Sequence, residues 1–185
     1  MNDIEFLFSF PLYRLEVPNW NLRKQRVLDA LPEMTDEHLH GGTYTDYPTS
    51  GAMQKLPSYE PVVTECLAEC LSEFGNTYPD EVRISSMWFE KSVRSAYRGA
   101  RNYSSLGFTG TLLVEHDRKE HAPTRFISPH MNYHSGELLD YRAPNVEEGV
   151  LFMFPSVLLH DIDPNDSDKP LTVICFTIPG TDSKS

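Results

Sequence analysis

His160 is the residue whose position in this sequence most favours a chemical role. It follows the apolar residues 157–159 and precedes an acidic turn, 161–165. The apolar run predicts a short buried strand that ends in a solvated loop. An imidazole at such a strand end is well placed to bind a metal ion, although a histidine there is also common without any ligand role. The interpretation of His160 therefore depends on whether other ligands lie near it.

The six other histidines are the first candidates for partners. His38 and His40 form a His-x-His pair, which on a strand would point both rings to one side, but the surrounding residues 32–57 are polar and rich in turn formers. No His-x-Asp or His-x-Glu sequence occurs in the chain. The remaining histidines fall in a loop-rich region that could fold back towards His160 and rebuild a metal site: His116, His121, His130 and His134.

The elements that would position these residues are mainly strands. Residues 4–15 predict a strand interrupted at Pro11, and two helices follow, one capped by Asn19 and ending before Pro32, the other over residues 58–74. Short apolar runs separated by Gly, Pro, Asn and Asp then predict strands over 82–89, 108–114, 124–127, 150–154, 157–159 and 171–178. The pattern predicts a mainly β protein with N-terminal helices (α+β), built as a sandwich or jelly roll.

Length and charge narrow the class of protein. The 185 residues predict one domain, 1–185, with a lead-in of a strand and two helices over 1–80 and a β core over 81–180. A net charge of −11 argues against nucleic-acid binding, and no apolar run is long enough to span a membrane. The acidic start of the chain lacks an export signal, and three cysteines make no disulfide framework, so we expect a cytoplasmic protein.

The segment around His160 resembles the last strands of the 2-oxoglutarate/Fe(II) oxygenases, a family with members in bacteria and tailed phages. The resemblance rests on Gly149, Phe154-Pro155-Ser156, His160 and Pro164-Asn165, on Leu7-Phe8 and Pro11-Leu12-Tyr13 near the start, and on Trp88, Tyr97 and Thr109-Gly110 in the middle. It covers nearly the whole chain. It implies a double-stranded β-helix, a cupin-like form of the jelly roll, with His160 at a metal-ligand position.

The chemistry of that family needs residues that this sequence lacks. Ferrous iron is held by a facial triad, and an arginine binds the far carboxylate of 2-oxoglutarate. Where the resemblance places a His-x-His motif, the sequence has Arg101-Asn102-Tyr103, and where it places the arginine, the sequence has Leu171. Arginine does not lose its proton to become a ligand, and leucine offers nothing to a carboxylate. Lys169 and Arg142 are basic but lie off the expected strand.

The sequence departs from the family's pattern at two further motifs. Ser128-Pro129-His130 stands where the family has Asp-Pro-Arg, and Gly149-Val150-Leu151 stands where it has Gly-Asp-Leu. We therefore expect a non-catalytic member without a cofactor, with His160 as a vestigial ligand position. Such a protein would serve a structural or protein-binding role through protein partners or self-association, for example in a phage virion as a neck, tail or baseplate part. The alternative is an active Fe(II)/2-oxoglutarate dioxygenase with an unknown substrate. A third interpretation is a pocket that binds a small anion on Arg101, assisted by Arg94 and Arg98.

Overall fold

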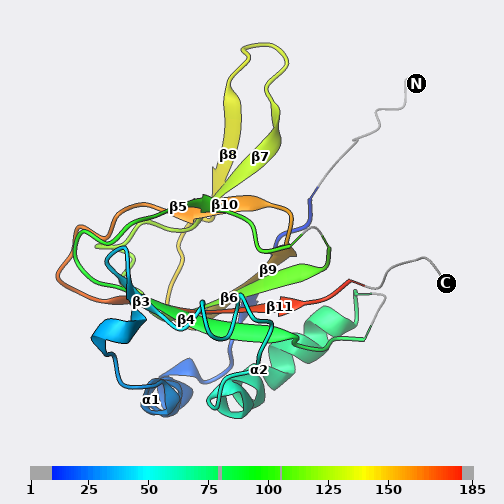
Figure 1. The fold of residues 1–185 in the computed structure, drawn as a ribbon. Helices are drawn as coiled ribbons and strands as arrows, with labels where there is room; N and C mark the ends of the chain where they lie inside the picture. The colour runs from blue at the N-terminus through cyan, green and yellow to red at the C-terminus, as the bar shows by residue number, and fades with distance from the viewer. Residues whose placement is uncertain (1–9, 79–80, 105, 181–185) are drawn as a thin grey trace.

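The computed structural model describes residues 10–78, 81–104 and 106–180, and in it two antiparallel β-sheets face each other. Two helices, α1 (Trp20–Ala30) and α2 (Glu60–Gly75), cover the outer face of the larger sheet (Figure 1). Neither has the length and apolar content that crossing a bilayer would require. Among the described residues the fold is thus mostly strand, with the helices on one side.

The larger sheet has seven strands, in the order β1-β9-β6-β11-β4-β3-β2. Their bounds are Tyr13–Glu16 (β1), Leu39–His40 (β2), Thr43–Thr45 (β3), Ser86–Ser92 (β4), Phe108–Glu115 (β6), Val150–Pro155 (β9) and Leu171–Ile178 (β11). The smaller sheet has the order β5-β10-β7-β8. Its strands are Arg98–Arg101 (β5), Arg125–Met131 (β7), Leu138–Arg142 (β8) and Leu159–Ile162 (β10). A short 3₁₀ helix, η1, spans Asp36–His38.

The chain passes repeatedly between the two sheets. From β4 in the larger sheet it enters β5 in the smaller, returns to β6, crosses to the β7–β8 hairpin, returns to β9, crosses to β10 and ends in β11. Strands that are distant in sequence therefore lie side by side, as β10 does with β5 and β7. This crossing brings His160, on β10, next to the end of β5.

The core has two layers, and β11 contributes to both. Val173 and Cys175 point between the sheets, while Ile174 and Phe176 point towards the helices. Side chains alternate along a strand, so a strand that is covered on both faces is apolar at most positions. This explains the long apolar runs that predicted β9 and β11.

Several sequence-based boundaries were wrong. β1 begins at Tyr13, after Pro11, and the predicted strand residues 4–9 lie outside the described residues. β4 runs to Ser92 and β10 begins at Leu159, later than predicted. Asn19 precedes α1, but it has a left-handed backbone (φ 53°) and its side chain makes no capping hydrogen bond, so the predicted cap is wrong.

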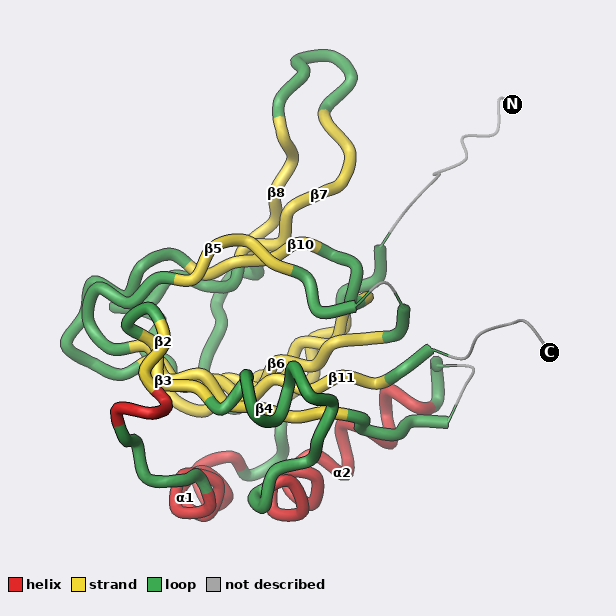
Figure 2. The backbone as a smooth tube through the Cα atoms, viewed as in Figure 1, coloured by secondary structure: helices red, strands yellow, loops and turns green. Residues whose placement is uncertain are grey.

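The β7–β8 hairpin extends beyond the body of the molecule as an arm (Figure 2). Its tip is closed by the Asn132 N–H, which donates to the Glu137 carbonyl, and the Gly136 N–H, which donates to the Asn132 carbonyl. The pairing of the two strands is irregular between Ile127 and Met131. Pro129 lies in that stretch and has no N–H to donate, which accounts for the irregularity.

Candidate functional site

His160 lies between the sheets, where β10 runs beside β5. Its Cα pairs with that of Arg101, and its ring centroid is 5.3 Å from that of Tyr103. The side chain is almost completely buried, with 4% exposed. The structure therefore brings together the three residues that the resemblance placed at the ligand positions, His160, Arg101 and Tyr103.

Arg101 and Tyr103 both bind a residue that the sequence did not single out, Glu90 on β4. The Arg101 Nη2 donates to Glu90 Oε2 at 2.6 Å, and the Tyr103 hydroxyl donates to Glu90 Oε1 at 3.2 Å. Arg101 Nε also donates to the Tyr103 hydroxyl at 2.6 Å, and Trp88 Nε1 donates to Glu90 Oε1 at 3.1 Å. These four residues form a closed hydrogen-bonded network, which we term the Glu90 cluster.

The Glu90 cluster is buried and internally neutralised. The side chains of Glu90 and Arg101 are 5% and 18% exposed. Burial of the guanidinium acts to lower the pKa of Arg101, but the Glu90 carboxylate and the Tyr103 hydroxyl outweigh it and raise this pKa above its ordinary value. Burial, with the nearby Glu90 charge, raises the pKa of Tyr103, so its phenol stays protonated. The cluster thus consists of one buried ion pair, one neutral phenol and the indole N–H of Trp88.

Aromatic rings fill the space around the cluster. The Trp88 and Tyr103 centroids are 4.5 Å apart, and Tyr47 packs on both. On the other side, the Phe154 ring lies 4.8 Å from His160. A tryptophan at this position also gives its indole N–H to the cluster, so the residue serves the apolar core and the polar network together.

The residues present do not fit ferrous iron and 2-oxoglutarate. Arg101 offers only donors and a positive charge, and Tyr103 offers a protonated phenol. Leu171 is buried in the apolar layer between the sheets, where it cannot pair with a carboxylate. In the described part of the chain, no group of three or more His, Cys, Asp or Glu side chains is arranged to hold a metal ion.

His160 itself is held as a neutral imidazole. Its Nδ1 lies 3.1 Å from the carbonyl oxygen of Leu158, a spacing that assigns the ring proton to Nδ1, from which it is donated to that oxygen. Burial lowers the pKa of His160 to about 4, because the charged form would be desolvated and Arg101 would repel it. The ring therefore packs in the aromatic interior without a charge.

This low pKa predicts an acid-dependent loss of stability. An unfolded histidine has a pKa of about 6.5, so between about pH 6.5 and 4 the unfolded chain binds a proton that folded His160 does not. Stability from this group is complete above pH 6.5 and should fall by about 3 kcal/mol as the pH drops to 4. Urea unfolding across this range measures the slope, which His160→Gln should reduce. An unchanged slope in the variant would contradict the assignment.

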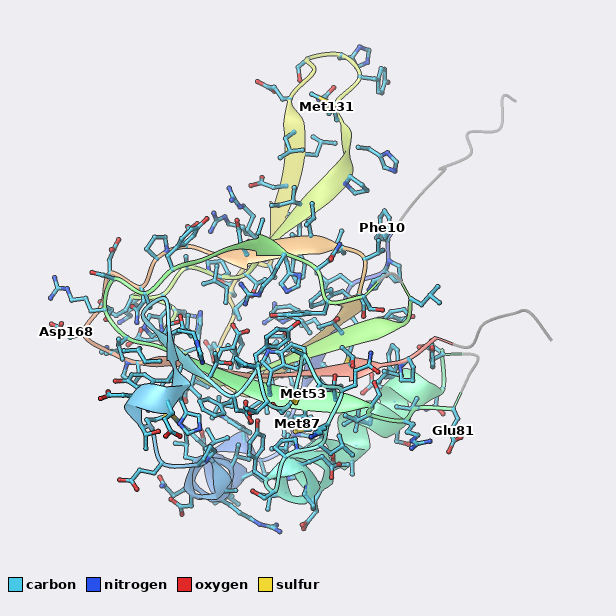
Figure 3. All side chains as sticks on the ribbon, viewed as in Figure 1. Phe10, Met53, Glu81, Met87, Met131 and Asp168 are labelled. Carbon is cyan, nitrogen blue, oxygen red and sulfur yellow. The ribbon has the colours of Figure 1, made fainter. Side chains whose placement is uncertain are left out.

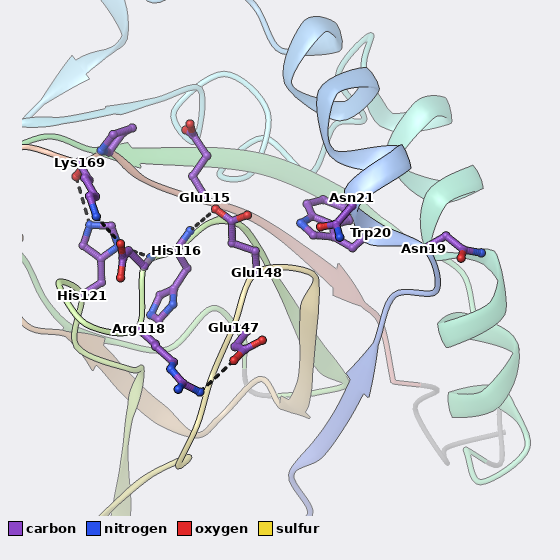
Figure 4. A pocket seen from close by; sticks show the side chains of 12 residues that line it. Asn19, Trp20, Asn21, Glu115, His116, Arg118, His121, Glu147, Glu148 and Lys169 are labelled. Atoms are coloured by element: carbon purple, nitrogen blue, oxygen red, sulfur yellow. Dashed lines mark hydrogen bonds and ion pairs between the residues drawn. The ribbon is translucent and has the colours of Figure 1, made fainter.

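The other histidines do not join His160. His116 and His121 lie 5.6 Å apart in a pocket of about 810 Å³ at the start of α1 (Figure 4). His121 accepts from the Asp117 N–H at Nδ1, and its Nε2 lies 3.1 Å from the Lys169 carbonyl oxygen, so a neutral ring with the proton on Nε2 satisfies both contacts. His116 is buried, which lowers its pKa, and neither ring nitrogen has a hydrogen-bond partner among the described residues.

The remaining candidates are dispersed over the surface. His130 and His134 are exposed on the arm, where the His134 ring lies against that of Tyr133, and His40 is exposed on β2. His38 is half-buried on η1, where its Nδ1 contacts the Thr35 hydroxyl. Ser128-Pro129-His130 falls in the irregular part of β7. The structure therefore does not assemble a metal site from these histidines within its described residues.

The basic residues considered for a carboxylate or an anion are already paired. Arg101 binds Glu90, Arg142 binds Asp163, Lys169 binds Asp117, and Arg94 binds Asp168. The Arg98 side chain lies outside the described part. An anion on Arg101 would have to displace the buried Glu90 carboxylate, which makes the anion-binding interpretation unfavourable.

Comparison with known proteins identifies the fold. No family model matches the sequence, and no curated protein matches it significantly. Among solved structures, an oxidoreductase of the 2OG-Fe(II) oxygenase family from Burkholderia pseudomallei matches with a TM-score of 0.61 at 12% identity, over 91% of this chain and 84% of that one. HygX from Streptomyces hygroscopicus, with nickel and 2-oxoglutarate bound, matches with 0.62 at 8%, over 92% and 83%.

A prolyl-4-hydroxylase from Pseudomonas putida has a TM-score of 0.58 at 10% identity, over 94% of this chain and 95% of that one. Likeness at this level of identity concerns the fold and does not extend to the chemistry of the site. The resemblance that was inferred from the sequence is thus confirmed at the level of the fold. The chain has the fold of the 2OG-Fe(II) oxygenase structures.

Proposed function

We propose that this protein is a non-catalytic form of the 2-oxoglutarate/Fe(II) oxygenase fold with a structural or protein-binding role. The observation that carries the proposal is the Glu90 cluster: two of the three ligand positions, Arg101 and Tyr103, are bound to a buried carboxylate and to each other. The passage of the chain between the sheets supports a double-stranded β-helix as the scaffold.

The cluster supports a structural role because it connects the two sheets, as a bound metal ion would connect the strands that supply its ligands. Glu90 comes from β4 in the larger sheet, whereas Arg101 comes from β5 in the smaller one. A buried ion pair with all its hydrogen bonds made fixes the relative position of two elements, and removing one partner is costly. In this proposal the ligand positions have been converted into a cross-link between the sheets.

The competing function is that of an active Fe(II)/2-oxoglutarate dioxygenase. Its support comes from solved structures of similar fold, such as HygX with nickel and 2-oxoglutarate bound. To act in this way, the chain would have to break the Arg101–Glu90 pair and supply two more ligands beside His160. The donor set at the cluster disfavours this, since an arginine cannot be a ligand.

Calorimetric titration with 2-oxoglutarate, in the presence of ferrous iron and without oxygen, tests the proposal. We expect no saturable heat, and no succinate when oxygen is admitted. The double variant Glu90→Gln/Arg101→Met, which leaves no unpaired buried charge, serves as a control for anion binding, since a signal that depends on Arg101 would indicate a simple charge effect. Saturable binding with one 2-oxoglutarate per chain, followed by succinate formation, would favour the dioxygenase.

We further propose that the protein acts with protein partners or by self-association, in the cytoplasm or in a virion. The resemblance to a family with tailed-phage members supports a neck, tail or baseplate part. The net charge of −11 disfavours a nucleic-acid partner. Purification of the tagged chain from its native source, followed by mass spectrometry, tests this step: virion proteins recovered at fixed stoichiometry would support it, and a chain recovered alone as a monomer would count against it.

A further inference from the structure

The arm ends the smaller sheet in a strand whose outer edge is unpaired. β8 is the last strand in the order β5-β10-β7-β8, and no strand in the described part of the chain pairs with its other edge. The N–H and C=O groups along such an edge can pair with another extended chain. Figure 3 labels Met131, at the end of β7, well outside the body of the molecule. The edge of β8 is therefore carried away from the body, where a second chain can approach it.

The three other edge strands have features that oppose such pairing, whereas β8 has few. β2 has only two residues, and β5 carries an arginine at each of its ends. The exposed side chains of β1 are the charged Arg14 and Glu16. Short length and charged side chains are devices that keep sheet edges apart. β8 is five residues long and has no lysine or proline, and its exposed side chains are mostly apolar: Leu138, Leu139 and Tyr141.

The charge of the arm favours a second copy of this chain as the partner. Residues 125–142 contain two arginines, one glutamate and one aspartate, so their formal charge is two minus two, or zero, in a chain of −11. Two copies repel each other where their acidic bodies approach, but not where two neutral arms meet. A basic partner would instead be attracted to the acidic body. The arm is thus the part of the described chain at which two copies meet with little repulsion.

We propose that two copies of this protein pair antiparallel through β8, so that their four-stranded sheets form one continuous sheet. A two-fold axis between the strands gives each β8 the other as its partner, and the assembly closes as a dimer because neither edge is left free. The inference deepens the proposed self-association and rests on it. It does not depend on whether the Glu90 cluster excludes iron.

The faces of β8 fit this pairing. Side chains alternate along a strand, so Leu139 and Tyr141 lie on one face and Leu138 lies on the other. The two-fold axis keeps like faces together, which places the apolar side chains of one copy beside those of its partner. Cross-strand apolar and aromatic pairs of this kind stabilise a sheet. Because one short strand from each copy makes the contact, the dimer should dissociate on dilution.

Size-exclusion chromatography with light scattering, run on the full chain over a range of concentrations, tests the inference. We expect the mass to rise from that of one chain, 21.2 kDa, towards twice that value. Leu138→Lys combined with Leu139→Lys places a charge on each face of the edge and should raise the dissociation constant of the dimer at least about tenfold. A monomer at every concentration would overturn the inference.

Leu22→Lys combined with Leu106→Lys is the matched control. Both leucines are exposed and lie outside the arm, and the double variant adds the same charge as the double variant of β8. Since added lysines also reduce the overall repulsion between acidic chains, this control isolates the effect of their position. Its dissociation constant should equal or fall below that of the unchanged protein. An equal rise in both double variants would overturn the inference.

Hydrogen–deuterium exchange of the unchanged protein identifies the surface that the two copies share. Exchange in β8 should slow as the concentration rises, because amides on its outer edge gain hydrogen bonds, whereas exchange in β1 should not change. In the Leu138 and Leu139 double variant, unchanged exchange in β6 and β11 reports that the chain is folded. A dimer without slower exchange in β8 would overturn this inference alone and leave self-association through another surface.

Discussion

Replacing Glu90 with glutamine should lower the free energy of unfolding by about 3 kcal/mol or more. The amide has almost the shape of the carboxylate and still offers an oxygen to Trp88 and Tyr103, but it removes the negative charge beside the Arg101 guanidinium. A buried charge left without its partner is strongly destabilising, since desolvation is no longer offset. Urea unfolding at pH 7 measures the change.

A double variant and a surface variant separate this effect from a general loss of packing. Adding Arg101→Met to Glu90→Gln removes the uncompensated charge and should recover most of the lost stability. Glu69→Gln breaks the Arg23–Glu69 pair, in which Glu69 is more than half exposed, and should have a much smaller effect. If Glu90→Gln were as stable as the unchanged protein, Glu90 would not be the counter-charge of Arg101.

Gly149→Ala should cost about 3 kcal/mol, because the residue meets two separate constraints. Its φ of 79° lies in the left-handed region, where a side chain costs about 1–2 kcal/mol. An added Cβ would also lie 2.4 Å from Trp20 Cγ, so the first residue of α1 would have to move away from β9. Such overpacking adds about 1–3 kcal/mol.

Gly136→Ala is the matched control for Gly149. Gly136 also has a positive φ, 71°, but an added Cβ would meet no atom within 4 Å. Its replacement should therefore show only the backbone cost of about 1–2 kcal/mol. Thermal unfolding of both variants measures the difference, and equal losses would mean that Trp20 does not constrain Gly149.

The helices and strands that were predicted best are those whose own residue pattern is enough to identify them. α2 carries Val63, Leu67, Cys70 and Phe74 at helical spacing and has a proline in its first turn, and β9 and β11 are largely apolar on both faces. The exposed strand β8 was missed because its polar and apolar residues do not alternate cleanly. The two-residue strand β2 is too short to give a pattern.

The candidate site could be predicted only in part. Arg101, Tyr103 and His160 could be placed together because a family resemblance supplies the long-range pairing of β5 with β10. Glu90 was missed, since nothing local connects a carboxylate on β4 to an arginine on β5. One feature of the sequence could have indicated it: Glu90 directly follows the apolar residues 87–89 of a predicted buried strand. A charged residue that is buried in such a strand requires a partner of opposite charge.

Iron binding by the purified protein tests whether a protein cross-link occupies the ligand positions. The chain would be loaded with excess ferrous iron without oxygen, passed through a desalting column, and analysed for metal, with His160→Ala as the matched variant. We predict far less than one iron per chain, with the same residual amount of iron in both proteins. One iron per chain that is lost in His160→Ala would show that His160 is a working ligand and that the cross-link does not occupy the ligand positions.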